Sequence, residues 1–183
     1  MKPQFLFIGL GNPGATYENT RHNAGWLFLD RLTKDFAIND WHMKDKFMSL
    51  IAEGAVGNAP IFLVKPTTYM NRSGEAIKKM VDFYKLDPSR QILVCCDDVD
   101  LERGTFRLRM DGGPGTHNGL RSVVDTIGEG FARLRFGLGP QPEQMDLAAW
   151  VTSALSDAEL RSLQHAFEAA VPEAKKHIEK LSK

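Results

Sequence analysis

Short apolar runs that stop at glycine, proline or acidic residues alternate along this chain with stretches of helical periodicity. Gln4–Ile8 is such a run; it ends at a glycine and predicts a buried strand. In Asn23–Phe36 apolar side chains recur at helical spacing, so a helix is expected there, capped by Asn19 or Thr20. Strands that alternate with helices predict an α/β fold: a single domain over residues 1–183 with a mixed, twisted β-sheet, flanking helices and a long C-terminal helix.

The same patterns place the remaining elements. Further helices are expected at Ser73–Tyr84 and Asn118–Ile127. Ser156 is expected to cap a long helix that runs through Leu181 and is interrupted or kinked near Pro172. Further strands are expected at Phe47–Ala52, Ile61–Val64, Gln91–Cys96, Thr105–Met110 and Arg133–Leu138. The first two of these strands read as an antiparallel pair, which is why the sheet is predicted to be mixed.

Composition limits the class of protein. The chain has 183 residues, enough for one domain with a sizeable core. Its 43% hydrophobic and 25% charged fractions are those of a soluble globular protein, and no apolar run reaches the length of a membrane span. The first residues resemble neither a signal nor a transit peptide, so a cytosolic location is expected. Cys95 and Cys96 are adjacent inside an apolar run, so neither a disulfide framework nor a zinc site is expected. The acidic residues Asp97, Asp98 and Asp100 could bind a metal instead, but matching His or Glu partners are not apparent in the sequence, so no metal site is predicted.

Charge is balanced overall but unevenly distributed along the chain. The net charge is zero, which argues against nonspecific coating of nucleic acid. Arginines nevertheless gather between residues 103 and 135, and two interpretations of them stay open: a solvated surface, or a local phosphate-binding face. These arginines are Arg103, Arg107, Arg109, Arg121, Arg133 and Arg135.

Three runs carry Asn, His and Gly where a core would not favour them. They are Gly9–Asn23, Lys65–Asn71 and Thr116–Gly119. Asparagine fills strands and helices poorly, but its amide offers both donors and an acceptor, which suits turns and polar recognition. Three such turns beside short apolar runs predict one cleft lined by neutral hydrogen-bonding groups and a histidine.

Gly9, Gly11 and Gly14 fit the spacing GxGxxG after a strand, a feature of dinucleotide-binding sites. That fingerprint requires a helix to open at the third glycine and an acidic residue at the end of a second strand. Here apolar periodicity does not begin until Trp26, and the acidic residues at the right distance fall in or just after the predicted helix. A nicotinamide oxidoreductase is therefore disfavoured.

A general base and a supporting acid stand out among the polar residues. His22 lies where a helix starts, and an imidazole titrates near neutral pH, so it can take a proton from water. Asp97 ends a buried strand, where a carboxylate bonded to one ring nitrogen would fix the tautomer and stabilise the imidazolium. Asp98 should point to the opposite face of the strand and away from the same cleft. With no nucleophile motif, direct attack by water is expected. The amide donors expected to stabilise charge are Asn12, Asn71 and Asn118.

These residues lie in runs that resemble the bacterial-type peptidyl-tRNA hydrolases. The resemblance extends from Phe7 to about Ala158, and several separate runs in the right order are far more specific than any one of them. The matching runs are Ile8–Gly14 with Tyr17, Thr20–Gly25, Lys65–Gly74, Asp97–Leu101, Thr116–Leu120 and Arg133–Gly139. The chain departs from the family pattern at Cys96, Thr116, Leu101–Gly104 and Gly139–Pro142.

The resemblance implies hydrolysis of the ester that joins a peptide, or an N-blocked amino acid, to tRNA. Such a reaction recycles tRNA from prematurely released peptidyl-tRNA. The resemblance also implies a monomer that needs no cofactor. By resemblance, His22 is the proton acceptor, Asp97 its supporting acid, and Asn12 the residue that distinguishes blocked from free aminoacyl-tRNA. The implied substrate contacts are Tyr17, Tyr69, Asn71 and Asn118, and the implied contacts to the tRNA 5′ phosphate are Arg109 and Arg135.

A rival from another class is a noncatalytic RNA-binding relative that keeps the fold for scaffolding. A pure binder has no need to hold both His22 and Asp97, so their presence favours the enzyme.

Overall fold

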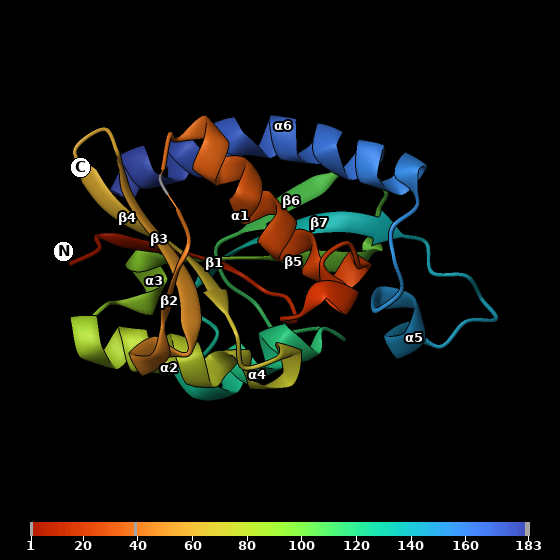
Figure 1. Ribbon diagram of the computed structural model, residues 1–183, viewed down its shortest axis with the longest axis horizontal. Coiled ribbons are helices and arrows are strands. Elements are labelled where there is room, and N and C mark those ends of the chain that lie inside the picture. The colour runs from red at the N-terminus through yellow and green to blue at the C-terminus, as the bar shows by residue number, and fades with distance from the viewer. Residues whose placement is uncertain (1, 39, 182–183) are drawn as a thin grey trace.

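In the part of the chain that the structure describes, seven strands form one mixed sheet, and helices cover both of its faces (Figure 1). A computed structural model describes residues 2–38 and 40–181, so the ends of the predicted domain 1–183 and residue 39 lie outside the described part. The strand order is β2-β3-β4-β1-β5-β7-β6. The predicted α/β class, mixed sheet and long C-terminal helix are confirmed.

The strands are β1 (Phe5–Gly9), β2 (His42–Lys44), β3 (Ser49–Val56), β4 (Ala59–Pro66), β5 (Ile92–Glu102), β6 (Phe106–Arg109) and β7 (Ala132–Gly139). The α-helices are α1 (Ala24–Asp35), α2 (Ser73–Tyr84), α3 (Pro88–Gln91), α4 (Asn118–Ile127), α5 (Leu147–Val151) and α6 (Asp157–Leu181). Short 3₁₀ turns are η1 (Ala15–Tyr17), η2 (Arg21–Asn23), η3 (Asp45–Phe47) and η4 (Met70–Arg72).

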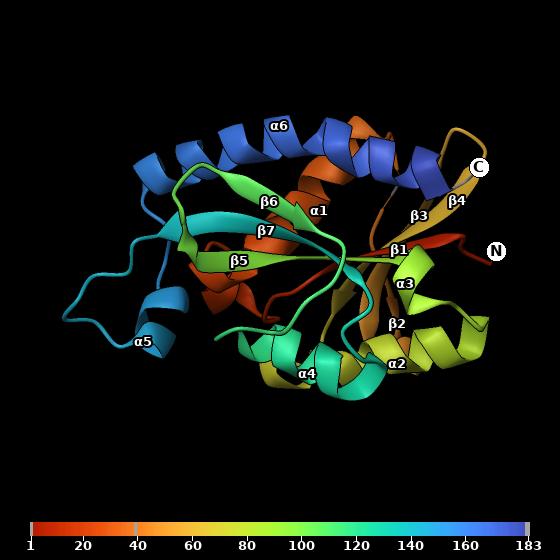
Figure 2. The same cartoon turned by 180° about the vertical axis from the view of Figure 1, so that it is seen from behind.

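The parallel strands bring their carboxyl ends to one edge of the sheet. β1 pairs in parallel with β4 and β5, and β5 with β7, whereas β3 and β6 pair antiparallel to their neighbours. Figure 2 shows β6 beside β7, and β6 is the strand at one edge of the sheet. β1 is central because every one of its residues is buried and apolar or glycine, which suits a strand covered on both faces. The segments that follow β1, β4 and β5 therefore meet at this edge.

The alternation of side chains along the strands divides the core into two layers. Phe5 and Phe7 of β1 pack with α1 and α6 on one face, while Leu6 and Ile8 pack with α2 and α4 on the other. Figure 1 shows these two pairs of helices on opposite sides of the sheet. A sheet covered on both faces leaves its carboxyl edge as the open place for a site.

Several sequence predictions need correction. The strand β2 and the short helices α3 and α5 were not predicted. β5 begins at Ile92, after Gln91 of α3, and continues through the acidic run to Glu102. α6 runs continuously from Asp157 to Leu181 with Pro172 inside it, so the predicted interruption is wrong, while a kink there stays a prediction. Ala170 and Ala174, on either side of the proline, are both buried in the core. Neither Asn19 nor Thr20 caps α1, which instead follows the 3₁₀ turn η2 directly.

The glycines after β1 serve close packing. A Cβ on Gly9 would lie 2.6 Å from the carbonyl oxygen of Gly25, and one on Gly11 would lie 2.5 Å from the ring of Trp26. The chain after Gly14 forms the turns η1 and η2, and α1 begins only at Ala24. No helix therefore opens at the third glycine to receive a pyrophosphate, which agrees with the sequence-based rejection of a dinucleotide site.

Candidate active site

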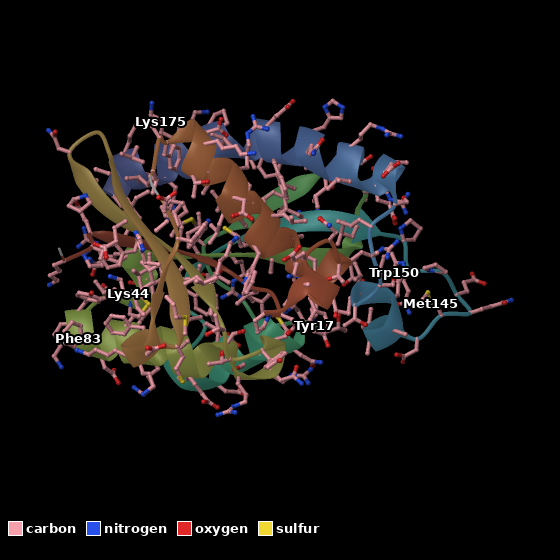
Figure 3. All side chains as sticks on the ribbon, in the orientation of Figure 1. Tyr17, Lys44, Phe83, Met145, Trp150 and Lys175 are labelled. Carbon is pink, nitrogen blue, oxygen red and sulfur yellow. The ribbon has the colours of Figure 1, made fainter. Side chains whose placement is uncertain are left out.

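A cleft of about 510 Å³ lies at the carboxyl edge of the sheet, between the turns after β1 and β4, the start of α4, and α5. Figure 3 places Tyr17 and Trp150 at this end of the molecule, and Lys44 and Phe83 at the opposite end. The structure brings eight of the nine predicted site residues into the lining of this cleft: Asn12, Tyr17, His22, Tyr69, Asn71, Asp97, Asn118 and Arg135. Arg109 does not line it.

His22 and Asp97 are paired in the cleft. His22 is held in the turn η2, and its Nδ1 lies 2.8 Å from Oδ1 of Asp97 near the carboxyl end of β5. Burial opposes the charged form of His22, but the attraction of Asp97 and the hydrogen bond to it outweigh burial, so the pKa of His22 is raised above 6.5. Burial likewise opposes the charge of Asp97, yet the two neighbouring histidines hold its pKa well below the usual range.

His117 is a third member of the group that the sequence did not reveal as such. Its Nε2 lies 2.9 Å from the same Oδ1 of Asp97, and its Nδ1 accepts the backbone N–H of Leu120 at 3.1 Å. Because Nδ1 is an acceptor, Nε2 carries the proton and donates to Asp97. The rings of His22 and His117 lie 4.8 Å apart. The only sequence signal was the position of His117 beside Asn118, just before a predicted helix.

The amide of Asn12 has one orientation. Its Oδ1 accepts the backbone N–H of Met70 at 2.7 Å, and an N–H can only donate, so Nδ2 remains as the free donor. Asn23 clamps the backbone of Asn12: Asn23 Oδ1 accepts the Asn12 N–H at 2.8 Å, and Asn23 Nδ2 donates to the Asn12 carbonyl at 3.0 Å. Asn71, the middle residue of η4, and Asn118, the first residue of α4, are exposed in the same cleft. Three amide groups therefore converge on the space beside His22.

Asp98 also lines the cleft, contrary to the expectation that it would face away. Strand alternation does send Asp97 and Asp98 to opposite faces, but the cleft lies at the end of the sheet and reaches both. Oδ2 of Asp98 lies 3.0 Å from Nε of Arg135, and Oδ1 accepts the backbone N–H of Asp100 at 2.9 Å. The Nε–H is not aligned well enough on Asp98 for a hydrogen bond, so the contact is an ion pair.

The arginines of β6 and β7 share one face of the sheet. Arg107 lies opposite Arg135, and Arg109 opposite Arg133, and directly opposed side chains in antiparallel strands point the same way. Arg133 is buried and donates to the backbone of residues 112, 113, 129 and 131, so it has a structural role in holding the loop before His117. Arg107 and Arg109 are exposed, which leaves Arg109 diagonal to Arg135 outside the cleft.

A buried ion pair joins the turn that holds His22 to the α5 side of the cleft. Arg21 donates to both carboxylate oxygens of Glu159 at 2.6 to 2.7 Å, and also to Oγ of Ser153 and the carbonyl of Ala154. Burial opposes the charge of Glu159, but hydrogen bonds from Arg21 and Ser156 lower its pKa to about 2. The mutual bonds of Ser156 and Glu159 also confirm the predicted cap of α6.

In the described part of the chain, His22, Asp97 and His117 are also the one group of potential metal ligands gathered closely enough, with ligand atoms within 4.8 Å of one another. The ligand atoms are already joined by hydrogen bonds, because Nδ1 of His22 and Nε2 of His117 both contact Oδ1 of Asp97. A cation would have to displace both protons. The arrangement therefore fits proton transfer better than metal binding. Cys95 and Cys96 are buried, and burial raises the pKa of each thiol, so neither is a nucleophile for the cleft.

Comparison with known proteins gives consistent matches. The family model described as Peptidyl-tRNA hydrolase matches residues 6–183. The peptidyl-tRNA hydrolase of Clostridium novyi (strain NT) is 41% identical over 177 residues, which cover 96% of this chain and 92% of that protein. The peptidyl-tRNA hydrolase of Finegoldia magna is 42% identical over 176 residues, covering 96% and 91%.

Solved structures give the same result. The crystal structure of peptidyl-tRNA hydrolase from Acinetobacter baumannii matches with a TM-score of 0.85 and 34% identity, covering 97% of this chain and 95% of that one. A peptidyl-tRNA hydrolase in complex with N-propanol matches with a TM-score of 0.91 and 33% identity, covering 100% and 92%. Within residues 2–38 and 40–181, no helix is both long and apolar enough to cross a membrane.

Proposed function

Because the chain belongs to the peptidyl-tRNA hydrolase family, we propose that it hydrolyses the ester between a peptide, or an N-blocked amino acid, and the 3′ ribose of tRNA. The products are the free peptide acid and a tRNA that can be charged again. The single observation that best supports this chemistry is the hydrogen bond of 2.8 Å between His22 Nδ1 and Asp97 Oδ1 inside a cleft.

His22 is the general base of the proposed reaction. Asp97 occupies Nδ1, so the lone pair of Nε2 takes a proton from water while the water oxygen attacks the ester carbonyl carbon. The tetrahedral intermediate collapses when the bond to the ribose oxygen breaks, and the imidazolium returns its proton to that oxygen. Asp97 stabilises the imidazolium between the two transfers, and the bond from His117 keeps Asp97 in place.

The amides of the cleft supply charge stabilisation and selectivity. Nδ2 of Asn12, whose orientation is set by Met70, donates to the peptide carbonyl of a blocked substrate, and Asn71 and Asn118 add neutral donors. A free α-amine is largely a cation and offers no such acceptor. An unpaired buried donor costs about 1–3 kcal/mol, so two or three contacts give a large preference for blocked substrates. Tyr17 and Tyr69 contact the 3′ end of the tRNA from the same lining.

Arginines meet the phosphates of the partner, peptidyl-tRNA. Arg135 is the one arginine or lysine among the described residues that line the cleft, and Arg109 lies diagonal to it on the same face of the sheet. We assign the pair to the 5′ phosphate of the tRNA, whose charge either guanidinium can neutralise. The predicted cytosolic location and monomeric state stay predictions, which cell fractionation and sedimentation test.

The direct assay compares two substrates. The protein is incubated with N-acetylaminoacyl-tRNA and with free aminoacyl-tRNA, and ester cleavage is followed in each. We expect cleavage of the first and little of the second. The rival scaffold protein would bind both tRNAs and cleave neither, and that result would overturn the proposed function.

A further inference from the structure

The backbone of Tyr69 adopts a conformation that belongs almost only to glycine. Its φ is 61° and its ψ is 159°. Other residues with positive φ, such as Met48 (φ 48°, ψ 46°) and Lys85 (φ 53°, ψ 55°), lie in the ordinary left-handed region, which non-glycine residues reach at modest cost. Tyr69 has an extended ψ with positive φ, and such strain persists only where the surroundings over-determine it.

The turn around Tyr69 is fixed on both sides. Before it, the backbone N–H and the hydroxyl of Thr67 both donate to the Met48 carbonyl, at 2.8 and 2.9 Å. After it, the Tyr69 carbonyl accepts the N–H of Arg72 at 3.1 Å, and the Met70 carbonyl accepts the hydroxyl of Ser73 at 2.9 Å. These bonds hold the backbone on both sides of Tyr69 and oppose its relaxation from the strained conformation.

The strained residue determines where the next peptide N–H points. That N–H belongs to Met70 and donates to Oδ1 of Asn12 at 2.7 Å. This bond is what leaves Nδ2 of Asn12 as the free donor in the cleft. A change in the backbone at residue 69 would rotate the 69–70 peptide and release the Asn12 amide from its one orientation.

The side chain explains why glycine does not occupy the position. The ring of Tyr69 lines the cleft and is 57% exposed, so it adds little to the core. An exposed ring at the rim of a nucleic-acid site offers a face on which a base can stack. Glycine would remove the strain and lose the ring.

We propose that Tyr69 is a positioning residue: its strained backbone orients the amide of Asn12 through the Met70 N–H, and its ring is the reason that the strain is kept. This rests on the proposed function, in which Asn12 distinguishes blocked from free substrates. The conflict between stability and function at residue 69 makes the proposal testable by a series of small side chains.

The test uses Tyr69→Gly, Tyr69→Ala and Tyr69→Val, which all lack the ring but resist a positive φ to increasing degrees. We expect Tm to fall in the order Gly, Ala, Val, by about 2–6 °C per step. We expect KM for blocked substrate to rise about 5-fold or more in all three, because each has lost the stacking face. The ratio of kcat/KM for blocked over free aminoacyl-tRNA should stay within about 2-fold of wild type for Gly and fall about 10-fold for Val.

The matched control is the same series at Lys85, an exposed residue with positive φ at the end of α2 and outside the cleft. There Tm should follow the same order while the selectivity ratio stays at the wild-type value. A selectivity ratio that is equal in the Gly, Ala and Val variants of Tyr69, or a Tm without that order, overturns the proposal. Failure of the wild-type protein to cleave blocked substrate would instead overturn the proposed function itself.

Discussion

Asp97 holds the Nδ1 side of His22 with a contact of 2.8 Å between Oδ1 and Nδ1, which makes Nε2 the nitrogen left to accept a proton. The same contact raises the pKa of His22 against the opposing effect of burial. A base acts only in its neutral form, so the pairing affects both the strength of the base and the pH at which it works.

The first prediction concerns the pH dependence of kcat/KM. Because the pKa of His22 is raised above 6.5, activity should rise with pH through a half-maximum above that value. Asp97→Asn removes the attraction of the carboxylate for the His22 imidazolium but leaves the effect of burial, which lowers the pKa of His22. The pH of half-maximal kcat/KM should therefore move below 6.5, and the kcat/KM reached at high pH should fall about 100-fold. Full pH profiles of both proteins provide the measurement. Asp98→Asn is the matched control, since Asp98 pairs with Arg135 and not with His22. A larger loss of kcat in that variant would show that the wrong carboxylate has been chosen.

The second prediction concerns His117, which shares Oδ1 of Asp97 with His22. His117→Ala removes one donor from that oxygen, so the carboxylate attracts the His22 imidazolium more strongly. The acidic limb of the pH profile should therefore move to higher pH, opposite to the effect of Asp97→Asn, with kcat lowered about 10-fold. His165→Ala, which changes an exposed histidine of α6, should change neither the acidic limb of the pH profile nor kcat. An acidic limb that stays in place would mean that His117 does not act through Asp97.

The third prediction concerns the arginines. Arg109→Ala and Arg135→Ala should raise KM for complete tRNA substrates, and each should reduce the salt dependence of binding by about one counterion. Substrates without the 5′ phosphate should be nearly indifferent to both changes. Arg90→Ala, at the distant helix α3, is the control and should leave KM unchanged. Equal losses on phosphorylated and dephosphorylated tRNA would assign these arginines to other phosphates.

The fourth prediction concerns selectivity. Asn12→Ala and Asn118→Ala should lower the ratio of kcat/KM for blocked over free aminoacyl-tRNA. They should do so chiefly by slowing cleavage of the blocked substrate, because the lost amides donate to its peptide carbonyl. The loss should be about 10-fold for Asn12, whose amide Met70 fixes in one orientation. Measured kcat/KM values for both substrates give the ratio. If neither variant changes it, the discrimination lies elsewhere in the cleft.

Much of the fold follows from local patterns in the sequence. The helices at Ser73–Tyr84 and Asn118–Ile127 are confirmed at both ends, because apolar periodicity and flanking glycine or proline coincide there. The strand β2 and the helices α3 and α5 were missed because each is a short segment. β2 exists through its pairing with β3, and α5 is a single turn capped by Asp146.

Eight of the nine residues predicted for the site lie around one cleft, but only some of the contacts among them were predicted, and the roles assigned to them stay predictions. His22 and Asp97 are 75 positions apart, and sequence reasoning paired them by their chemistry. The second bond to Asp97, from His117, joins three separate segments, and no local pattern encodes it. Asp97 and Asp98 do point to opposite faces of the strand, as predicted, but the expectation that Asp98 lies outside the cleft was wrong. A cleft at the end of a sheet is reached from both faces, and both residues line it.

The most direct test of the proposed mechanism is kcat for N-acetylaminoacyl-tRNA in His22→Ala, with His165→Ala as the control and thermal unfolding as the check that both variants are folded. We predict that a folded His22→Ala protein loses about 100-fold or more of kcat while His165→Ala keeps the wild-type value. Near-normal kcat in folded His22→Ala would contradict the assignment of His22 as the base.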